Sequence, residues 1–269
     1  MKFNMTDAHM LLAARIDDLI KASDRGEPVC GNFLTPGEAA FAVAYLKEKR
    51  AEDRIVLLGG YGDAERRRLV AIPPYLLDMD GDAVENMSIY FPEIYENAVR
   101  AIKICGSGYR KLSHRDYMGS LLSLGIERSA LGDIVVIDDS TAVVFCTDKI
   151  HSFLMSDIDR IATDKVNCHD FKPDEDFAPK REFLPIRDTV ASNRLDCVVG
   201  ALTDLSREKA QNVIRSGLCE VNYLPEERCD VSVPTPCVVT VRGYGKFQVL
   251  SFDGETKKGR LRLIAQKYV

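Results

Sequence analysis

The amino-acid sequence predicts an α+β protein built from three domains, on three observations. The chain has 269 residues, a length that accommodates two or three domains of roughly 100–200 residues each. Its composition, with 46% hydrophobic and 29% charged residues, is typical of a globular protein and excludes a disordered, collagen-like or disulfide-rich chain. Segments with a helical 3.6-residue period alternate with short runs of β-branched residues, which is the pattern of a mixed fold.

Residues 1–79 are predicted to form a small N-terminal α/β domain. Leu12, Ile16 and Leu19 fall on one face of a first helix, as the helical period requires. A second helix begins at Thr35-Pro36, because threonine is a good N-cap and proline suits the first helical position. Residues 54–58 are apolar enough for a buried strand.

The glycines Gly59-Gly60-Tyr61-Gly62 follow this strand and raise the possibility of a phosphate loop. No Gly-Lys-Ser/Thr follows them, and their spacing is not that of a dinucleotide fingerprint. We therefore favour a turn that leads into an exposed basic cluster at Arg66–Arg68.

Residues 80–170 are predicted to form a central domain with the order β-α-β-β-α-β. Residues 101–105 give a strand, a helix runs from Ser113 to Gly125, and a hairpin spans residues 134–146. A helix over 148–158 and a strand over 165–168 complete the order. This order is the split βαβ of ferredoxin-like folds, and RNA-recognition domains share it. The aromatic RNA-stacking signature of those domains is missing.

The segment Ser113-His114-Arg115-Asp116 brings a nucleophile, a base and an acid into four successive positions. Successive helical residues point in different directions, so these side chains cannot form a triad among themselves. We predict that Ser113 caps a helix, with Asp116 favoured in its first turn by the helix dipole. His114 and Arg115 are then exposed at a helix N-terminus, where phosphate binds readily.

Residues 171–183 are predicted to be a linker, since two prolines and charges of both signs occur there. Residues 184–269 are predicted to form the third domain. We expect Ser192 to cap its first helix, which carries the apolar stripe Leu195, Val198, Val199 and Leu202. Ser206 starts a second helix that ends at Gly217. Val221-Asn222 then begins an extended segment.

Cations and amides recur along this third domain. Arg207, Gln211 and Arg215 are four residues apart and line one side of the second helix. Arg242 and Lys246 alternate with glycines and aromatic residues. Four more cations follow at Lys257, Lys258, Arg260 and Arg262. The planar fork of arginine suits phosphate, and aromatic rings can stack on unpaired bases.

Two ordered sets of residues resemble known families. Arg194-Leu195-Asp196, Ser206-Arg207-x-Lys209-Ala210-Gln211, Val221-Asn222 and Val241-Arg242-Gly243-x-Gly245-Lys246 resemble the S4 RNA-binding domain. Over nearly the whole chain, the blocks Gly59–Arg66, Leu112–Asp116, Leu124–Ile134 and Gly254–Arg262 resemble the YlmH family.

The resemblance implies an N-terminal domain, an RNA-recognition-like central domain and a C-terminal S4 domain in a bacterial cytoplasmic protein associated with cell-division gene clusters. It also implies binding to ribosomal RNA and peptidyl-tRNA on the large ribosomal subunit, in the rescue of stalled nascent chains with C-terminal tailing. The residues expected to contact RNA are Ser192, Arg194, Ser206, Arg207, Lys209, Gln211, Arg215, Asn222, Arg242, Lys246, Lys257, Lys258, Arg260, Arg262, His114 and Arg115.

Two other functions stay open at the level of the sequence. S4 domains are often attached to pseudouridine synthases, whose catalytic aspartate lies in an Arg-Leu-Asp stretch. Here Arg194-Leu195-Asp196 lies inside the S4 motif itself, and the remaining residues do not resemble a catalytic domain. We therefore predict a non-enzyme without catalytic residues. The other alternative is a division-site adaptor without an RNA function, for which Arg207, Lys209 and the cations of residues 257–260 would be dispensable.

Metal, cofactor and membrane binding are not expected. The eight cysteines form no Cys-x-x-Cys pair and the four histidines supply no close ligand pairs, which a structural zinc site requires. No apolar run approaches the roughly 20 residues of a membrane span, and the first residues have no apolar signal region. We expect a cytoplasmic monomer with reduced cysteines.

Charge is distributed unevenly along the chain. The net charge is −5, with 36 Lys and Arg against 41 Asp and Glu. Residues 181–269 hold 14 Lys and Arg against 11 Asp and Glu, a net of +3, so the remainder carries −8. The acidic total thus contains a locally basic domain, and RNA binding is expected to be confined to one side of the protein.

Overall fold

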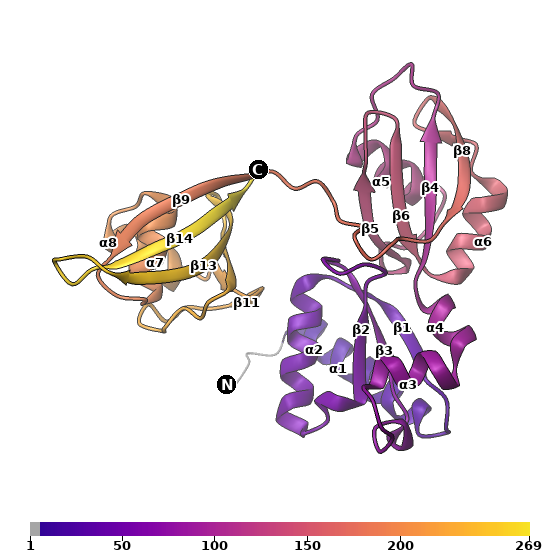
Figure 1. Cartoon of the computed structure of the whole chain (residues 1–269), viewed down its shortest axis with the longest axis horizontal. Coiled ribbons are helices and arrows are strands. Elements are labelled where there is room, and N and C mark those ends of the chain that lie inside the picture. Colours follow the sequence, from indigo (N-terminus) through magenta and orange to yellow (C-terminus); the bar gives the residue numbers. More distant parts are fainter. Residues whose placement is uncertain (1–5) are drawn as a thin grey trace. The chain divides into compact units, whose positions relative to one another are not determined.

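The protein consists of two compact units (Figure 1). The computed structural model describes residues 6–269; unit 1 ends at Lys180 and unit 2 runs from Arg181 to Val269. Both units combine helices with antiparallel sheets, which confirms the α+β class. No helix within residues 6–269 is long and apolar enough to cross a membrane.

Unit 1 begins with a three-stranded antiparallel sheet that has helices on both faces. The strand order is β1-β3-β2. The elements are α1 (Asp7–Ser23), β1 (Val29–Leu34), α2 (Pro36–Lys49), β2 (Ile55–Leu58), β3 (Arg67–Ala71), α3 (Ala83–Tyr90) and α4 (Pro92–Ala98). Ile16 and Phe41 pack α1 and α2 against one face of the sheet. Met87 and Ala98 pack with Val70 of β3 on the other face.

Local sequence explains both of the first two helices. The Thr35 side chain accepts the backbone N–H of Glu38, and Glu38 bonds back to the N–H of Thr35 at 2.7 Å, which is a capping box. The predicted helix start at Thr35-Pro36 is therefore confirmed. Leu12 and Ile16 are buried as their spacing predicts. The sequence did not predict β1.

The second sheet of unit 1 has the order β5-β6-β4-β8-β7. The elements are β4 (Arg100–Gly106), α5 (His114–Ser123), β5 (Leu131–Val136), β6 (Thr141–Cys146), α6 (Asp148–Asp157), β7 (Arg160–Ile161) and β8 (Asp164–Phe171). The predicted order β-α-β-β-α-β is confirmed, with β7 added, and the pairing of the four long strands is that of a split βαβ unit. Tyr117 and Leu154 pack α5 and α6 on one face.

Two predictions about the limits of the central domain are corrected. Residues 80–98, assigned by the sequence to the central domain, pack on the first sheet through Met87 and Ala98. Residues 171–183 are not a solvated linker throughout, because Phe177 packs on Tyr61, Phe145 and Phe171. In both cases scattered apolar side chains find partners far away in the sequence.

The basic cluster predicted to be exposed at Arg66–Arg68 is also corrected. The side chain of Arg66 is buried and donates to the carbonyls of Leu131 and Arg128 at 2.9 and 3.0 Å. Arg68 is half-buried and donates to the carbonyls of Gly31 and Ala98, both at 2.6 Å. These guanidinium groups satisfy backbone carbonyls between segments, as buried polar groups must.

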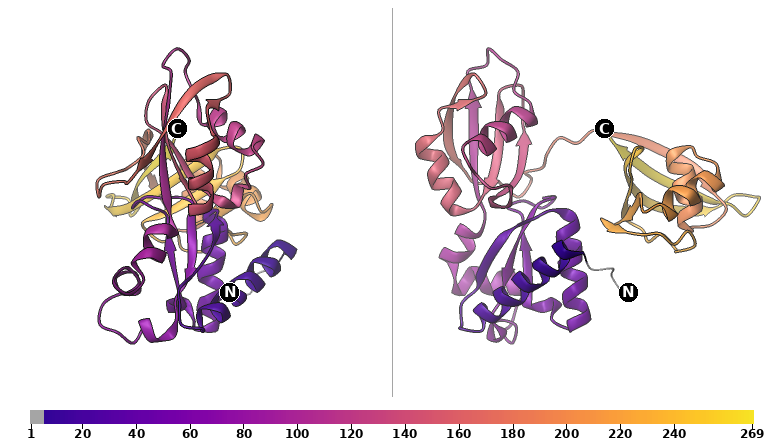
Figure 2. Two further views of the ribbon diagram at one scale, coloured as in Figure 1. Left: turned by 90° about the vertical axis from the view of Figure 1, so that its right-hand side faces the viewer. Right: turned by 180° about the vertical axis from the view of Figure 1, so that it is seen from behind.

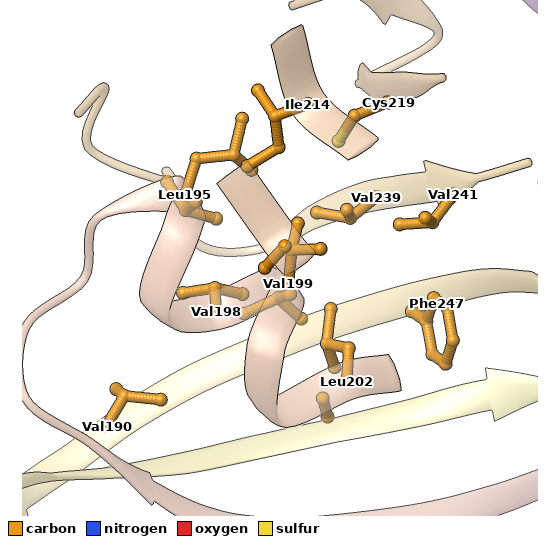
Figure 3. Close-up of a cluster of buried hydrophobic side chains, with 14 of the residues drawn as sticks. Val190, Leu195, Val198, Val199, Leu202, Ile214, Cys219, Val239, Val241 and Phe247 are labelled. Carbon is orange, nitrogen blue, oxygen red and sulfur yellow. The ribbon is translucent and has the colours of Figure 1, made fainter. Parts of the chain in front are cut away.

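Unit 2 is a six-stranded antiparallel sheet with two helices on one face. The strand order is β11-β10-β12-β13-β14-β9. The elements are β9 (Phe183–Val190), α7 (Leu195–Thr203), α8 (Arg207–Arg215), β10 (Cys219–Val221), β11 (Leu224–Pro225), β12 (Cys237–Val241), β13 (Gly245–Glu255) and β14 (Leu261–Tyr268). Figure 3 shows Val199 and Leu202 of α7 near Val239 and Phe247 of the sheet, and Leu195 beside Ile214 of α8.

Candidate nucleic-acid interface

The carboxylate of Asp196, in the first turn of α7, organises the helical side of unit 2. Asp196 is fully buried. Its oxygens accept hydrogen bonds from Nε of Arg194 at 3.2 Å, Nε of Arg207 at 3.1 Å and Nε2 of Gln211 at 2.8 Å. One buried carboxylate thus fixes two guanidinium groups and one amide, which come from the residue before α7 and from α8.

The charge of Asp196 is stabilised by these donors. Burial by itself raises the pKa of the carboxyl group, but the hydrogen bonds from Arg194, Gln211 and Arg207 outweigh it. The pKa is therefore held well below its ordinary value. The arginines themselves remain accessible, since their side chains are 41% and 60% exposed. Asp196 thus orients the guanidinium groups of Arg194 and Arg207 at the surface; we call these two groups the arginine forks.

A shallow pocket of about 330 Å³ adjoins these forks. Its lining residues are Arg194, Gln211, Arg215, Glu227, Arg228, Cys229 and Asp230. Within the described residues, the exposed Arg215 makes no ion pair, whereas Arg228 pairs with Glu226 at 2.9 Å. Arginine is suited to phosphate because its fork can donate two parallel hydrogen bonds.

The start of α7 differs from the prediction that Ser192 caps it. The helix begins at Leu195 after Arg194, and the Ser192 hydroxyl contacts the Cys197 sulfur. The first N–H groups of the helix donate instead to the carbonyls of Val231 and Cys229. Backbone carbonyls of residues 229–231 therefore accept the N–H groups of the helix start that the Ser192 side chain was expected to cap.

The start of α8 agrees with the sequence. Ser206 is its N-cap and accepts the N–H of Lys209, and Gly217 has a φ of +68° just after the helix. Both Arg207 and Lys209 are exposed on this helix. Arg207 and Gln211, predicted to form an exposed ridge with Arg215, also donate inward to Asp196.

Asn222 is corrected from an extended residue to a turn residue. Its φ is +49°, and its side-chain oxygen accepts the N–H of Val238 at 3.0 Å. Together with Tyr223 it forms the two-residue connection between β10 and β11. The amide oxygen of Asn222 therefore supports the sheet.

The remaining predicted residues of unit 2 lie near both ends of a long strand. Lys257 and Lys258 are exposed in the turn after β13, and Arg260 donates to Thr189 of β9 at 3.0 Å. Arg242 and Lys246 lie before and at the start of β13. An eleven-residue strand is roughly 35 Å long, so these two groups do not form one patch. Arg262 lies on β14.

His114 and Arg115 lie in unit 1, at the exposed start of α5. Asp116 accepts hydrogen bonds from the N–H and hydroxyl of Ser113 at 2.8 and 2.7 Å, which confirms the predicted cap. Partial burial and the nearby Arg128 lower the pKa of His114, so this side chain is neutral at physiological pH. Only Arg115 therefore adds a cation to this helix end.

The open face of the second sheet of unit 1 is partly covered. Phe145 and Phe171 lie at one end of this face, where Tyr61 and Phe177 pack on them. In RNA-recognition domains, aromatic side chains on the sheet stack on bases. Here the aromatic side chains of this face contact one another instead.

Two of the sequence blocks that suggested the family, Gly59–Arg66 and Leu124–Ile134, are joined by hydrogen bonds to Asp133, a contact that we call the clasp. Asp133 accepts hydrogen bonds from the Tyr61 hydroxyl at 2.6 Å and from the N–H groups of Glu65 and Arg66 at 2.8 and 3.1 Å. A glycine fits at position 132, next to Asp133, because a Cβ there would lie 2.8 Å from the Phe33 ring. These blocks have a structural role within unit 1.

Catalysis by Asp196 is incompatible with its surroundings. Its side chain has no exposed surface, and its oxygens accept four hydrogen bonds from Arg194, Arg207 and Gln211. Sequence reasoning missed its central role, and the available signal was an aspartate in a helical first turn, two residues after Arg194. No cluster of three metal-ligating side chains occurs among residues 6–269.

Comparisons with known proteins assign the class. A family model described as "Putative RNA-binding domain in YlmH" matches residues 92–175. "Ribosome-associated protein quality control protein P2" of Bacillus subtilis (strain 168) is 24% identical over 243 residues, covering 88% of this chain and 86% of the relative. "Cell division protein ylmH from Streptococcus pneumoniae", a solved structure, has a TM-score of 0.47 and 14% identity, covering 64% of this chain and 95% of that chain.

The α+β fold and the matched domain define an RNA-binding protein, and neither description names an enzyme. The resemblance of the chain to the YlmH family is supported by the model match over residues 92–175 and by the similarity to the Bacillus subtilis relative over most of the chain.

Proposed function

We propose that unit 2 is an S4-type module that binds RNA phosphates through the arginine forks held by Asp196. The observation that carries this proposal is the convergence of Arg194, Arg207 and Gln211 on one buried carboxylate. Side chains held in place before binding lose less conformational entropy when the ligand arrives. Arg215 adds a cation beside the same pocket.

We further propose a footprint that extends from these helices to the turn after β13. Arg260 donates to Thr189 near the end of β9, and the chain continues from β9 into the segment that carries Arg194. The hairpin cations Lys257, Lys258 and Arg260 therefore adjoin the helical group, whereas Arg262, between the core-facing Leu261 and Leu263, lies on the other face of the sheet. Ser206, Lys209 and Ser192 belong to the same proposed footprint, and Arg242, Lys246 and Asn222 belong to a second contact region.

The proposed RNA partners are ribosomal RNA and peptidyl-tRNA on the large ribosomal subunit. The name of the Bacillus subtilis relative, which refers to ribosome-associated quality control, supports this choice, as does the family resemblance. We infer a role in the rescue of stalled nascent chains, with C-terminal tailing, by a cytoplasmic monomer.

We propose three domains within the two units. The separate cores around Phe41 and around Tyr117 support a division of unit 1 into an N-terminal domain and an RNA-recognition-like domain. Arg115 at the start of α5, with the neighbouring His114, is the contact proposed for this second domain.

Arg215→Ala and Lys258→Ala test the RNA-binding surface. Each is expected to weaken binding to ribosomal RNA and to reduce the slope of log affinity against log salt by about 1, because one phosphate contact is lost. Titrations of the full chain at several salt concentrations measure both quantities. Lys47→Ala, an exposed lysine of α2, is the control. Unchanged affinity and slope in both variants would refute the assignment.

Sedimentation of the tagged full-length protein through a sucrose gradient tests the ribosomal partner. We expect the protein to migrate with the large subunit, and the Arg215→Ala and Lys258→Ala double variant to shift toward free protein. Migration of the wild-type protein only as free protein contradicts the ribosomal assignment and leaves RNA binding to be judged by the titrations.

A further inference from the structure

The sheet of unit 2 has one face that no helix of this unit covers. Helices α7 and α8 pack on the opposite face, as Figure 2 shows from behind. In an antiparallel sheet, side chains alternate between the two faces. Phe247, Val249, Leu263 and Ala265 point into the core. The alternating positions on the uncovered face include Arg187, Lys246, Gln248, Arg262, Gln266 and Tyr268.

Aromatic rings and a cation meet at one end of this face. The rings of Tyr268 and Phe183 are in edge contact, with centroids 4.9 Å apart. The ammonium group of Lys246 lies 4.7 Å from the centroid of the Tyr268 ring and 5.0 Å from that of Tyr223. A positive charge is therefore held beside two tyrosine rings, which is a cation–π arrangement.

The turn that carries Tyr223 has an unusual residue choice. Asn222 and Tyr223 have φ values of +49° and +65° and connect β10 to β11. Both residues of such a two-residue turn need positive φ, and asparagine followed by glycine is favoured. A tyrosine pays a steric cost there that glycine avoids. The turn itself gives no reason for an aromatic side chain at this position.

The charges of the face complement a nucleic-acid backbone. Arg187 and Arg262 are exposed beyond the aromatic end. Gln248 and Gln266 hydrogen-bond to each other between the two groups at 2.8 Å. The strand register places Glu220 of β10 on this face beside Thr240, and Asp253 of β13 lies on it near Arg262, where it accepts the Ser251 hydroxyl at 2.7 Å. This face therefore carries three cations, Lys246, Arg187 and Arg262, and two carboxylates, Glu220 and Asp253.

We propose that this face binds an unpaired RNA segment, with bases stacked on Tyr223 and Tyr268 and phosphates bound by Lys246, Arg187 and Arg262. Stacking on tyrosine does not depend on base identity, and a row of cations follows the backbone. The inference rests on RNA binding by unit 2, and it adds a second surface on the side of the sheet opposite the arginine forks.

The test compares three fluorescent probes with the full-length protein: a twelve-nucleotide single-stranded RNA, the same strand with abasic positions, and a blunt RNA duplex. Tyr223→Gly combined with Tyr268→Ala is expected to weaken single-strand binding about tenfold or more and to leave the duplex and abasic probes unchanged. The double Tyr→Phe variant should retain wild-type affinity. Tyr75→Ala, at a tyrosine of unit 1 that is 41% exposed, is the control.

Tyr223→Gly alone keeps the test valid if the double variant does not fold, because glycine suits the turn. Ultraviolet crosslinking of the wild-type protein to a 4-thiouridine strand gives a second measurement, with crosslinks expected at Tyr223 and Tyr268. Unchanged single-strand affinity in the folded tyrosine variants, or crosslinks confined to residues 192–215, would overturn the inference. If Arg215→Ala still weakens binding in that case, the proposed function stands. If neither surface responds, both fail.

Discussion

Asp196 joins the hydrophobic core of unit 2 to its charged helical surface. Leu195 and Val198 beside it are buried in the core, while its carboxylate holds Arg194 and Arg207. Removing a buried acceptor leaves its donors without a partner, which costs roughly 1–3 kcal/mol. The same residue therefore links stability to the geometry of the proposed RNA surface.

We expect Asp196→Asn to lower the free energy of unfolding of unit 2 by roughly 1–3 kcal/mol, because its amide group opposes donors that require a carboxylate. The variant should also weaken RNA binding, since both arginine forks lose their anchor. Urea unfolding followed by circular dichroism measures the first effect. Asp230→Asn, an exposed acid beside the same pocket, is the matched control. Equal stability of wild type and Asp196→Asn would contradict this role.

The pH dependence follows from the lowered pKa of Asp196. A carboxyl group with a lower pKa in the folded state stabilises the protein above its unfolded pKa, and this stabilisation is lost as pH falls toward the folded pKa. The stability difference between wild type and Asp196→Asn should be full near pH 7 and shrink below about pH 4. Unfolding curves from pH 7 to 3 test the sign. A difference that grows with acidity would contradict it.

Among the structural elements, the loop from Tyr61 to Arg66 and strand β5 are tied by Asp133. The Asp133 carboxylate accepts two backbone N–H groups and one hydroxyl of this loop. It thus gives the loop's donors a hydrogen-bond partner, which buried backbone groups require. Arg66 extends the same joint by donating to Leu131 and Arg128. The contacts join the two sheets of unit 1.

Asp133→Ala is expected to destabilise unit 1 by roughly 2–3 kcal/mol, since the two N–H groups and the hydroxyl lose their acceptor. Thermal unfolding of the full-length protein should show an earlier transition for unit 1 with that of unit 2 unchanged. Asp139→Ala removes an exposed carboxylate of the same region, whose partner is Lys111, and should have little effect. A matching loss in both variants would count against the clasp.

For the whole molecule, the division into two units has a direct consequence. The core of unit 2 is made from its own residues, from Val190 to Ala265, so residues 181–269 should fold alone. Trypsin is expected to cleave near Lys180 and Arg181, which lie beyond the packed Phe177. Mass spectrometry identifies the products, and a cooperative thermal transition of the isolated fragment completes the test. An unfolded fragment would refute independence.

Much of the local structure could be predicted because its causes lie within a few residues. The caps at Thr35, Ser113 and Ser206 each use an acceptor or donor three residues away, so the helix starts followed from spacing alone. Ser192 failed as a cap because residues 229–231 took its place, a contact that no local pattern contains. Arg66 was predicted to be exposed because its acceptors lie more than 60 residues away.

The sequence by itself determined the α+β class, the β-α-β-β-α-β order, the basic character of residues 181–269 and the residue types of the proposed RNA surface. Only the tertiary structure decided that Arg194, Arg207 and Gln211 converge on Asp196, and that Lys246 lies far from Lys257 along β13. The physical reason is the separation along the chain over which each kind of interaction acts. Periodicity and capping act within one or two turns of chain, whereas burial and strand register depend on partners that only the folded topology brings together.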